Sequence, residues 1–509
     1  MINQILNGIS GKIMKDLDRE RKDPAIYQWR IFEEFVRKGR KTVFGADHDF
    51  DRITDYASFC RQVPVREYDD FEKYINIIKI GRKDVLWPGK VNYLAQSSGT
   101  SSSKSKHLPV TDDSLRKCHY YGMIKMLATY LHANPKSKLF TGRALTLGGS
   151  VTANELAASN RKVFIGDLSA IMLSKSPAIA EIARCPKKEI ALLSDFNKKV
   201  EEIAKSCSRL NVTSISGVPS WNLVMLKRIL EYNSASNIYD IWPDMELFMH
   251  GGISMDPYWK EYRNILPKDS MHYVENYNAS EGYFAFQDDP QDRSMLLCCN
   301  NSVFYEFVRL SDLEKVKAGE QGLTRTVDDV ETGVQYAMII STNAGLWRYI
   351  IGDTVEFTSL RPHKLKITGR TKLFINTFGE ELMISNAEQA IEKSCSLYDC
   401  IVREYTVAPI FMKVGEKGGH QWVIEFSKRP ADLEKFAASL DKAVCSVNSD
   451  YEAKRTSSVI QPLTITEVPE NTFMKWMESR GKVGGQNKVP RLSGSRDIIE
   501  SLLKFSDGK

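Results

Sequence analysis

The stretch from Gln96 to Lys106 is rich in small hydroxyl side chains and ends in lysines. Every residue from Ser97 to Ser103 is Ser, Thr or Gly, so the backbone N–H groups there have little side-chain cover. Hydroxyl groups, accessible N–H groups and a lysine ammonium are the donors that surround a bound phosphate. The stretch therefore favours a polyphosphate site, although a flexible serine-rich linker has the same composition and is the alternative from these residues alone.

Two carboxylates farther along the chain suit other parts of a nucleotide. Glu281 lies near the end of the segment His272–Gly282, where it could bind Mg²⁺ that accompanies nucleotide phosphates. It could equally cap the start of a helix together with Ser280. Asp353 follows a glycine at the end of an apolar run. There it could accept hydrogen bonds from ribose hydroxyls, or it could be a turn aspartate that bonds its own backbone.

A pair of glycines marks another strand end. Glu246–Ser254 has an apolar strand pattern that stops at Gly251 and Gly252, and ligands of open α/β sheets bind at such ends. The same pair could simply form a turn. The eight histidines show no metal-ligand spacing, so His250 and His107 are interpreted as ordinary neighbours of the motifs.

Strand and helix patterns surround these residues and predict an α/β fold. A strand over Val91–Ala95 leads into the serine stretch and a helix starts at Thr111, which is the strand, loop, helix order of a phosphate site. The apolar spacing of that helix predicts a core-facing side that includes Met123 and Ile124. From Leu139 to Ser220 strands alternate with helices, which predicts a mostly parallel sheet covered by helices.

The chain after residue 370 has the pattern of a compact α+β lid. A helix is predicted over Ala431–Val447, and strands are predicted over Leu373–Ile384, Arg403–Lys413, Gln421–Phe426 and Leu463–Val468. At 509 residues the chain exceeds what one hydrophobic core usually serves, so two or more domains are expected.

Composition narrows the functional class. Lysine and arginine number 70 and aspartate and glutamate 64, scattered along the chain, so no concentrated basic patch indicates nucleic acid. Nine cysteines without a Cys-x-x-Cys pair fit reduced, buried thiols and not a disulfide framework. No apolar run approaches the roughly 18 residues that span a bilayer, and the N-terminus is too polar for a signal peptide. We therefore expect a cytoplasmic protein with neither nucleic acid nor membrane as partner; its oligomeric state is not predicted.

The order of the motifs resembles a known family. The serine stretch with Lys106, then Tyr277–Glu281, then Arg348–Asp353, is similar to the three nucleotide motifs of the plant-type acyl-acid-amido synthetases, the auxin- and jasmonate-conjugating enzymes. That family is a branch of the adenylate-forming superfamily, which includes acyl-CoA ligases and firefly luciferase. Ser479–Arg491 resembles the family's terminal signature, so the resemblance covers nearly the whole chain. Ile350 departs from the pattern, because the family commonly has a basic residue there, and one arginine is left in that motif.

The resemblance implies a large N-terminal adenylation domain, residues 1–370, and a small mobile C-terminal domain, residues 371–509, with a hinge near Arg370–Lys372. In the implied roles, the serine loop and Lys106 hold phosphate, Glu281 binds Mg²⁺, Asp353 holds the ribose, and Tyr277 flanks adenine. The residues implied to bind ATP are Ser97, Ser98, Gly99, Thr100, Ser101, Tyr277, Ser280, Glu281, Asp353 and Arg370, and the implied catalytic residues are Lys106 and Lys488.

The implied reaction has two steps and needs ATP and Mg²⁺. A small carboxylic acid is adenylated on the α-phosphorus of ATP, and the amine of an amino acid then takes the acyl group to form an amide. Mg²⁺ and lysine suit the first step, since they neutralise the charge that builds up when a carboxylate meets a triphosphate. An acid–CoA ligase would share this step, and a nucleotide-binding protein without turnover is a further alternative. A P-loop ATPase is disfavoured because Lys104 stands where the second glycine, counted from Gly99, would be required.

Overall fold

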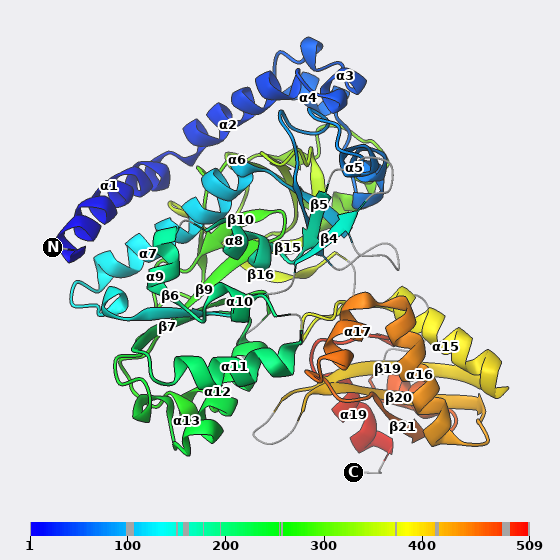
Figure 1. Ribbon diagram of the computed structural model, residues 1–509. Coiled ribbons are helices and arrows are strands. Elements are labelled where there is room, and N and C mark those ends of the chain that lie inside the picture. Colours follow the sequence, from blue (N-terminus) through cyan, green and yellow to red (C-terminus); the bar gives the residue numbers. More distant parts are fainter. Residues whose placement is uncertain are drawn as a thin grey trace.

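A twelve-stranded mixed sheet forms the centre of the N-terminal part of the protein (Figure 1). The computed structural model describes residues 2–97, 106–148, 151–155, 162–176, 178–193, 195–253, 255, 258–371, 374–412, 417–480 and 489–506. The spatial order of the strands is β13-β12-β14-β15-β16-β11-β10-β9-β8-β7-β3-β6.

One half of this sheet is parallel. Its strands are β3 (Arg143–Thr146), β6 (Arg184–Cys185), β7 (Val212–Gly217), β8 (Leu247–Gly251) and β9 (His272–Ala279). Helices in the connections are α9 (Ala178–Ala183), α10 (Lys188–Ala191), α11 (Phe196–Cys207), α12 (Pro219–Asn233) and α13 (Trp259–Ile265). The parallel sheet predicted for this region is thus confirmed for β3, β6 and β7, and the carboxyl ends of its strands share one edge.

The other half is antiparallel. It consists of β10 (Gly282–Phe286), β11 (Met295–Leu297), β12 (Val303–Arg309), β13 (Thr324–Arg325), β14 (Gln335–Thr342), β15 (Tyr349–Leu360) and β16 (His363–Arg370). The change of direction occurs between β9 and β10, where Ala279 pairs with Gly282 across a two-residue turn. A turn this short can join only antiparallel strands, so the hairpin ends the parallel half of the sheet.

A second, four-stranded sheet carries the two ends of the serine stretch. It contains β1 (Tyr93–Ser97), β2 (Lys106–Val110), β4 (Val151–Glu155) and β5 (Lys162–Gly166) in the order β2-β1-β5-β4. β1 and β2 are antiparallel, with Ser97 opposite Lys106. The predicted order of strand, loop and helix is therefore wrong, because a buried strand intervenes before the helix that begins after the N-cap Thr111.

That helix has an irregular start. α6 (Asp112–Ser114) continues into a π-helical turn over Leu115–Tyr120 and then into α7 (Tyr121–Ala133). Met123 and Ile124 are 36% and 41% exposed, so the prediction that they face the core is wrong. The buried residues of α7 instead include Gly122, Lys125 and Thr129, so its core side carries small and polar residues that an apolar pattern does not select.

Two long N-terminal helices pack along the outside of this part (Figure 1). They are α1 (Ile2–Lys22) and α2 (Pro24–Gly39), and Asp23 caps the second by accepting a hydrogen bond from the Ile26 N–H. In the core, Glu20 of α1 pairs with Lys125 of α7 at 2.5 Å. The other helices of this region are α3 (Val43–Asp47), α4 (Tyr56–Gln62), α5 (Glu72–Lys79), α8 (Leu168–Lys175) and α14 (Leu313–Lys317).

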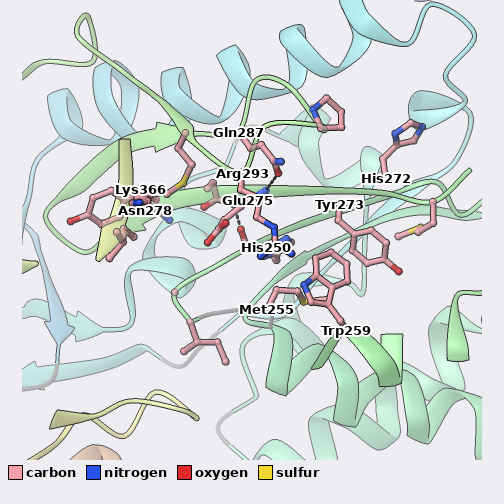
Figure 2. A pocket seen from close by; sticks show the side chains of 18 of the residues that line it. His250, Met255, Trp259, His272, Tyr273, Glu275, Asn278, Gln287, Arg293 and Lys366 are labelled. Atoms are coloured by element: carbon pink, nitrogen blue, oxygen red, sulfur yellow. Dashed lines mark hydrogen bonds between the residues drawn. The ribbon is translucent and has the colours of Figure 1, made fainter. Parts of the chain in front are cut away.

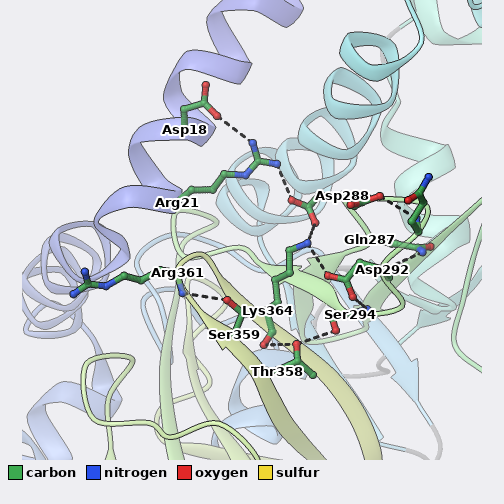
Figure 3. A network of polar contacts seen from close by, with 12 residues as sticks. Asp18, Arg21, Gln287, Asp288, Asp292, Ser294, Thr358, Ser359, Arg361 and Lys364 are labelled. Carbon is green, nitrogen blue, oxygen red and sulfur yellow. Dashed lines mark hydrogen bonds and ion pairs between the residues drawn. The ribbon is translucent and has the colours of Figure 1, made fainter.

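A polar network ties the end of α1 to the loop between β10 and β11 (Figure 3). Arg21 contacts the Asp288 carboxylate at 2.8 Å, and Lys364 of β16 contacts the same carboxylate at 2.9 Å. Lys364 also pairs with Asp292 at 2.8 Å. The side chain of Asp288 is almost fully buried, so this carboxylate joins three segments that are distant in sequence.

The C-terminal part is a three-stranded sheet between two layers of helices. Its strands are β19 (Ile401–Ile410), β20 (Gly419–Lys428) and β21 (Thr464–Val468), and its helices are α15 (Ile384–Tyr398), α16 (Leu433–Val447), α17 (Ser449–Thr456), α18 (Thr472–Ser479) and α19 (Asp497–Ser506). The predicted α+β fold is confirmed. The strand predicted over Leu373–Ile384 is wrong, because that segment forms the short strands β17 (Phe374–Ile375) and β18 (Leu382–Met383) with a loop between them.

The two parts share a hydrophobic core at this loop. Phe378 is fully buried in a cluster that includes residues of β7, α12 and α13. The indole N–H of Trp221 donates to the Phe378 carbonyl at 3.1 Å, and the Tyr258 hydroxyl donates to the Thr377 carbonyl at 3.2 Å. The division into domains at residue 370 stays a prediction. Within the described part of the chain, none of the helices has the length and apolar character needed to cross a membrane.

Candidate functional site

Some of the site residues that were predicted from the sequence lie outside the part of the chain that the structure describes. Ser98, Gly99, Thr100, Ser101 and Lys488 lie outside the described residues, as does Lys372 of the predicted hinge. Ser97 is the last residue of β1 and Lys106 the first of β2, so they bracket the serine loop. Lys106 is 4% exposed, which places its ammonium in the interior beside the loop.

Glu281 lies in the hairpin turn between β9 and β10, next to Ser280. No helix begins here, so the interpretation as a helix cap is wrong. The Glu281 side chain is buried, and this burial raises the pKa of its carboxyl group, although the positive charges of Lys106 and Arg370 act in the opposite direction. A buried carboxylate in this state gains from a bound cation, which is the physical property expected of a Mg²⁺ ligand.

Tyr349 connects Lys106 to Glu281. The Lys106 ammonium donates to the Tyr349 hydroxyl at 3.0 Å, and that hydroxyl donates to a Glu281 carboxylate oxygen at 3.3 Å. Sequence reasoning did not identify Tyr349 as a site residue, and its place inside the motif that ends at Asp353 was the available signal. Tyr349 lies four residues before Asp353 in β15, and the pairing of β14 with β15 is irregular between them.

Asp353 lies in the strand β15, and the side chains of two residues from other strands hold it. The Tyr277 hydroxyl donates to one of its oxygens at 2.5 Å, and the Arg370 guanidinium forms an ion pair with the other. Asp353 therefore does not close a turn, and the turn interpretation is wrong. Burial opposes the charge of Arg370, but the carboxylates of Asp353 and Glu381 outweigh it and raise the pKa of the guanidinium. Arg370 is a fixed cation at this point.

A cleft of about 1260 Å³ opens at these residues and runs along β8 and β9 (Figure 2). Tyr277, Asp353 and Arg370 line it, together with Gly252. Toward one end of the cleft lie Asn278 and Lys366, and toward the other lie Trp259 and Tyr273 (Figure 2). This volume is ample for a nucleotide, and its lining offers ring faces, carboxylates and a guanidinium.

The glycine pair lies at the end of β8, where Gly251 is the last residue of the strand and Gly252 lines the cleft. A Cβ on Gly251 would lie 2.3 Å from the Asn276 carbonyl oxygen, and Gly252 has a φ of +83°. Both positions therefore favour glycine, and ligand binding at this strand end stays a prediction. His250 lines the cleft and is 3% exposed, and burial lowers the pKa of its ring to about 4. His107 has a pKa lowered to about 4 by burial and by Lys79.

Arg348, the remaining basic residue of the third motif, does not face this site. Its guanidinium pairs with the buried Glu306 at 2.8 Å and donates to the carbonyl oxygens of Cys60 and Val63. Its backbone has a φ of +46°, and the residue is 3% exposed. Arg348 is therefore a structural cation, whereas Arg370 lines the cleft.

These groups can neutralise and orient a polyphosphate. Lys106 supplies a buried positive charge, and Glu281 supplies a hard oxygen ligand. Among the described residues no cluster of three or more His, Cys, Asp or Glu side chains could hold a metal ion. A cation bound by Glu281 would therefore take its other ligands from phosphate and water, which is the usual coordination of Mg²⁺ beside a nucleotide.

Comparison with protein families matches nearly the whole chain. Residues 13–271 match the GH3 family N-terminal domain, residues 296–370 the GH3 family central domain, and residues 385–497 the GH3 family C-terminal domain. An indole-3-acetic acid-amido synthetase, GH3.4 of Arabidopsis thaliana, is 23% identical over 96% of this chain and 93% of its own. The jasmonoyl–L-amino acid synthetase JAR4 of Nicotiana attenuata is 20% identical over 96% of this chain and 94% of its own.

Solved structures share the fold. The GH3.15 acyl acid amido synthetase superposes with a TM-score of 0.59 at 16% identity, covering 96% of this chain and 95% of that one. The 2-hydroxyisobutyryl-CoA ligase, in complex with 2-HIB-AMP and CoA, superposes with a TM-score of 0.56 at 12% identity over 97% of this chain and 92% of that one. At these identities the likeness establishes the architecture and confirms the predicted α/β fold with its smaller C-terminal part.

Proposed function

The chain belongs to the GH3 family, and on this premise we propose that it is an ATP-dependent ligase that joins a small carboxylic acid to an amino acid. In the first step a carboxylate oxygen of the acid attacks the α-phosphorus of ATP, and pyrophosphate leaves. In the second step the amine nitrogen of the amino acid attacks the acyl carbon, AMP leaves, and the nitrogen loses a proton. The products are an amide, AMP and pyrophosphate.

One observation carries this proposal. The residues of three separate sequence motifs meet in two linked groups, Lys106 with Tyr349 and Glu281, and Tyr277 with Asp353 and Arg370. The second group lines the cleft, and the charges of the two groups influence each other. An arrangement of this kind can hold the phosphates and the ribose of one nucleotide at the same time.

Each residue has a proposed role in the first step. Lys106 and the serine loop hold the phosphates, and Asp353 accepts hydrogen bonds from ribose hydroxyls while Tyr277 flanks the adenine. Arg370 orients Asp353 through their ion pair. Glu281 holds Mg²⁺, which supplies the positive charge that offsets the phosphates during attack. Because the acyl-adenylate is itself activated, no nucleophilic side chain is required.

The second step is proposed to use the C-terminal domain, residues 371–509, as a lid. An acyl-adenylate reacts readily with water, so a lid that covers the cleft protects it. Asn376 already lines the cleft, and Glu381 contacts Arg370 at 3.4 Å across the proposed boundary. Lys488 is the proposed catalytic residue of this domain, and the hinge is proposed at Arg370–Lys372.

An acid–CoA ligase is the second candidate. It is favoured by the fold shared with the 2-hydroxyisobutyryl-CoA ligase over 97% of this chain. Such an enzyme would form the same acyl-adenylate but would transfer the acyl group to a thiol. The acceptor is therefore the point on which the two functions differ.

Exchange of labelled pyrophosphate into ATP, measured over a panel of small carboxylic acids, tests the first step. We expect at least one acid to support exchange, and we expect the Lys106→Ala variant to lose it, which assigns the activity to this site. Amino acids or CoA are then added and the product is identified by mass spectrometry. An amide supports the amido synthetase and a thioester the alternative. Binding of ATP without exchange for any acid would contradict both and favour a nucleotide-binding protein without turnover.

A further inference from the structure

The Tyr349 hydroxyl occupies the space between two opposite charges. It accepts one hydrogen bond from the Lys106 ammonium and uses its single proton to donate to Glu281. Lys106 and Glu281 do not approach within the 4.0 Å of an ion pair, although both are buried. The two charges are therefore joined through a neutral group and not directly.

The position of Tyr349 is fixed from both sides. Its neighbour Arg348 is anchored by Glu306 and by backbone carbonyls on the side away from the site. The Tyr349 ring is fully buried and meets the Phe71 ring edge to face, with centroids 6.0 Å apart. Burial and the charge of Glu281 raise the pKa of the hydroxyl well above its ordinary value, so it stays protonated at physiological pH. Tyr349 is thus a rigid hydroxyl and not an acid or base.

A direct pair between Lys106 and Glu281 would work against catalysis. In a buried site, opposite charges in contact attract strongly, and separating them for a substrate costs free energy. The ammonium would then be unavailable to phosphate and the carboxylate unavailable to a metal ion. A spacer that satisfies both groups with hydrogen bonds keeps each one charged and ready for its own partner.

Resting on the proposed function, we propose that Tyr349 is a positioning residue that holds Lys106 and Glu281 apart, so that the first can receive phosphate and the second Mg²⁺. Removal of the hydroxyl lets the two side chains collapse into a direct ion pair. Mg·ATP must then break that pair before it binds. The role differs from ordinary packing, because the ring alone would satisfy the core.

The Tyr349→Phe variant tests this role through its requirement for Mg²⁺. The ring and its packing stay, and only the hydroxyl is lost. We expect the Mg²⁺ concentration for half-maximal ATP–pyrophosphate exchange to rise about tenfold, the typical effect of one hydrogen bond to a charged group. Tyr305→Phe is the matched control: its ring is also fully buried, but its hydroxyl donates to the Cys298 carbonyl, so its Mg²⁺ requirement should not change.

The pH dependence of ATP–pyrophosphate exchange distinguishes two effects of Tyr349→Phe. One is the collapse of Lys106 and Glu281 into a direct ion pair, and the other is the loss of a hydrogen-bond donor to Glu281 alone. The charged groups that influence Glu281 are Lys106 of β2, Asp353 of β15 and Arg370 of β16. If Lys106 moves into contact with Glu281 in Tyr349→Phe, the carboxylate is stabilised, and the acid limb of the pH profile shifts to lower pH. If the hydroxyl were only a donor, its loss would shift the limb to higher pH. An upward shift, or an unchanged limb with an unchanged Mg²⁺ requirement, would overturn the proposal.

The failure of this proposal can be told apart from the failure of the proposed function. If the wild-type protein supports no exchange with any acid, the ligase function is contradicted. Titration calorimetry at several Mg²⁺ concentrations then measures how Tyr349 affects the Mg²⁺ dependence of ATP binding, and it needs no turnover. A Tyr349→Phe protein with the same Mg²⁺ dependence of ATP binding as wild type would exclude Tyr349 as the spacer.

Discussion

Glu281 carries a charge in a place where burial opposes it. Burial raises the pKa of its carboxyl group, and Lys106 and Arg370 compensate only in part. Protonation removes the ability to bind a metal ion, so metal binding and proton release are linked at this residue. The energetic consequence is that the free site holds a proton up to a higher pH than an ordinary glutamate does.

We therefore predict that binding of Mg·ATP weakens as pH falls through the raised pKa of Glu281, which lies above the ordinary value of 4.5 for this group. Below that pKa the carboxyl is protonated and must lose its proton to bind Mg²⁺, whereas above it no proton is released. Calorimetry in buffers of different ionisation enthalpy measures the proton count directly. Glu281→Gln should bind Mg·ATP weakly at every pH and release no proton, and a wild-type affinity independent of pH would contradict this role.

Lys106 is predicted to matter most for the transition state of adenylation. Loss of one charge-stabilising donor typically lowers a rate by ~10²–10³-fold, so Lys106→Ala should reduce exchange by that factor at saturating ATP. Lys205→Ala, at an exposed lysine of α11, is the control and should leave the rate unchanged. Equal rates for wild type and Lys106→Ala, with both proteins folded, would remove Lys106 from the site.

At the level of single residues, sequence reasoning predicted the charged groups better than the neutral ones. Lys106, Glu281, Asp353 and Arg370 were recognised because their charges have an evident use beside a nucleotide, and the structure brings them together. Their roles stay predictions. Tyr349 was missed because a hydroxyl acts here only through two partners that are distant in sequence.

The secondary structure elements were predicted where one pattern dominates and missed where a pattern is interrupted. α16 and β21 follow regular spacing and were found within a few residues of their predicted bounds. The face of α7 was wrong because its buried side carries Gly122, Lys125 and Thr129, which an apolar pattern does not select. The strand predicted across Leu373–Ile384 was wrong because its apolar residues belong to two short strands and a loop, which apolar content alone does not separate.

The loop between β10 and β11 depends on a single carboxylate. Asp288 receives both Arg21 and Lys364, and Gln287 beside it lines the cleft. We predict that Asp288→Asn lowers the free energy of unfolding by about 2 kcal/mol, because two partly buried cations each lose one of their two charged partners. Denaturant unfolding measures this.

The Asp288→Asn variant should also bind ATP less well in the cleft, and we expect a higher KM for ATP with a nearly unchanged kcat. Asp18→Asn is the matched control, since Asp18 also pairs with Arg21 but is exposed, and little change is expected. Unaltered stability of Asp288→Asn would show that the network in Figure 3 does not hold the loop.

For the whole molecule, the sequence indicated two parts but not how they meet. Chain length predicted two or more domains, and the family resemblance implied a large N-terminal domain and a small C-terminal one. The contact between them includes the buried ring of Phe378 and the hydrogen bond that Trp221 donates to the Phe378 carbonyl oxygen. A contact across 157 residues leaves no periodic trace in either segment, so it could not be predicted from spacing.

The orientation of the N-terminal and C-terminal parts in this structure indicates which of the two proposed reaction steps that orientation serves. Asn376, in the loop that Trp221 and Tyr258 hold, lines the cleft. Val489, which follows Lys488, packs instead in the cluster of β19, β20, α18 and α19, and that cluster contributes no residue to the described cleft lining. If Lys488 serves adenylation, the orientation with Asn376 at the cleft serves the amide-forming step.

We therefore predict opposite effects for two variants of this interface. Trp221→Phe removes the N–H donor to the Phe378 carbonyl but keeps an aromatic ring, so it should weaken this orientation and lower amide formation from a supplied acyl-adenylate about tenfold, with little loss of pyrophosphate exchange. Lys488→Ala should do the reverse. Single-turnover assays of each step measure the two effects separately, with Trp476→Phe as the control, because that indole donates to Ser501 within the C-terminal part. If Trp221→Phe and Lys488→Ala each slow both steps equally, the two parts do not alternate between orientations, and one fixed arrangement must serve the entire reaction.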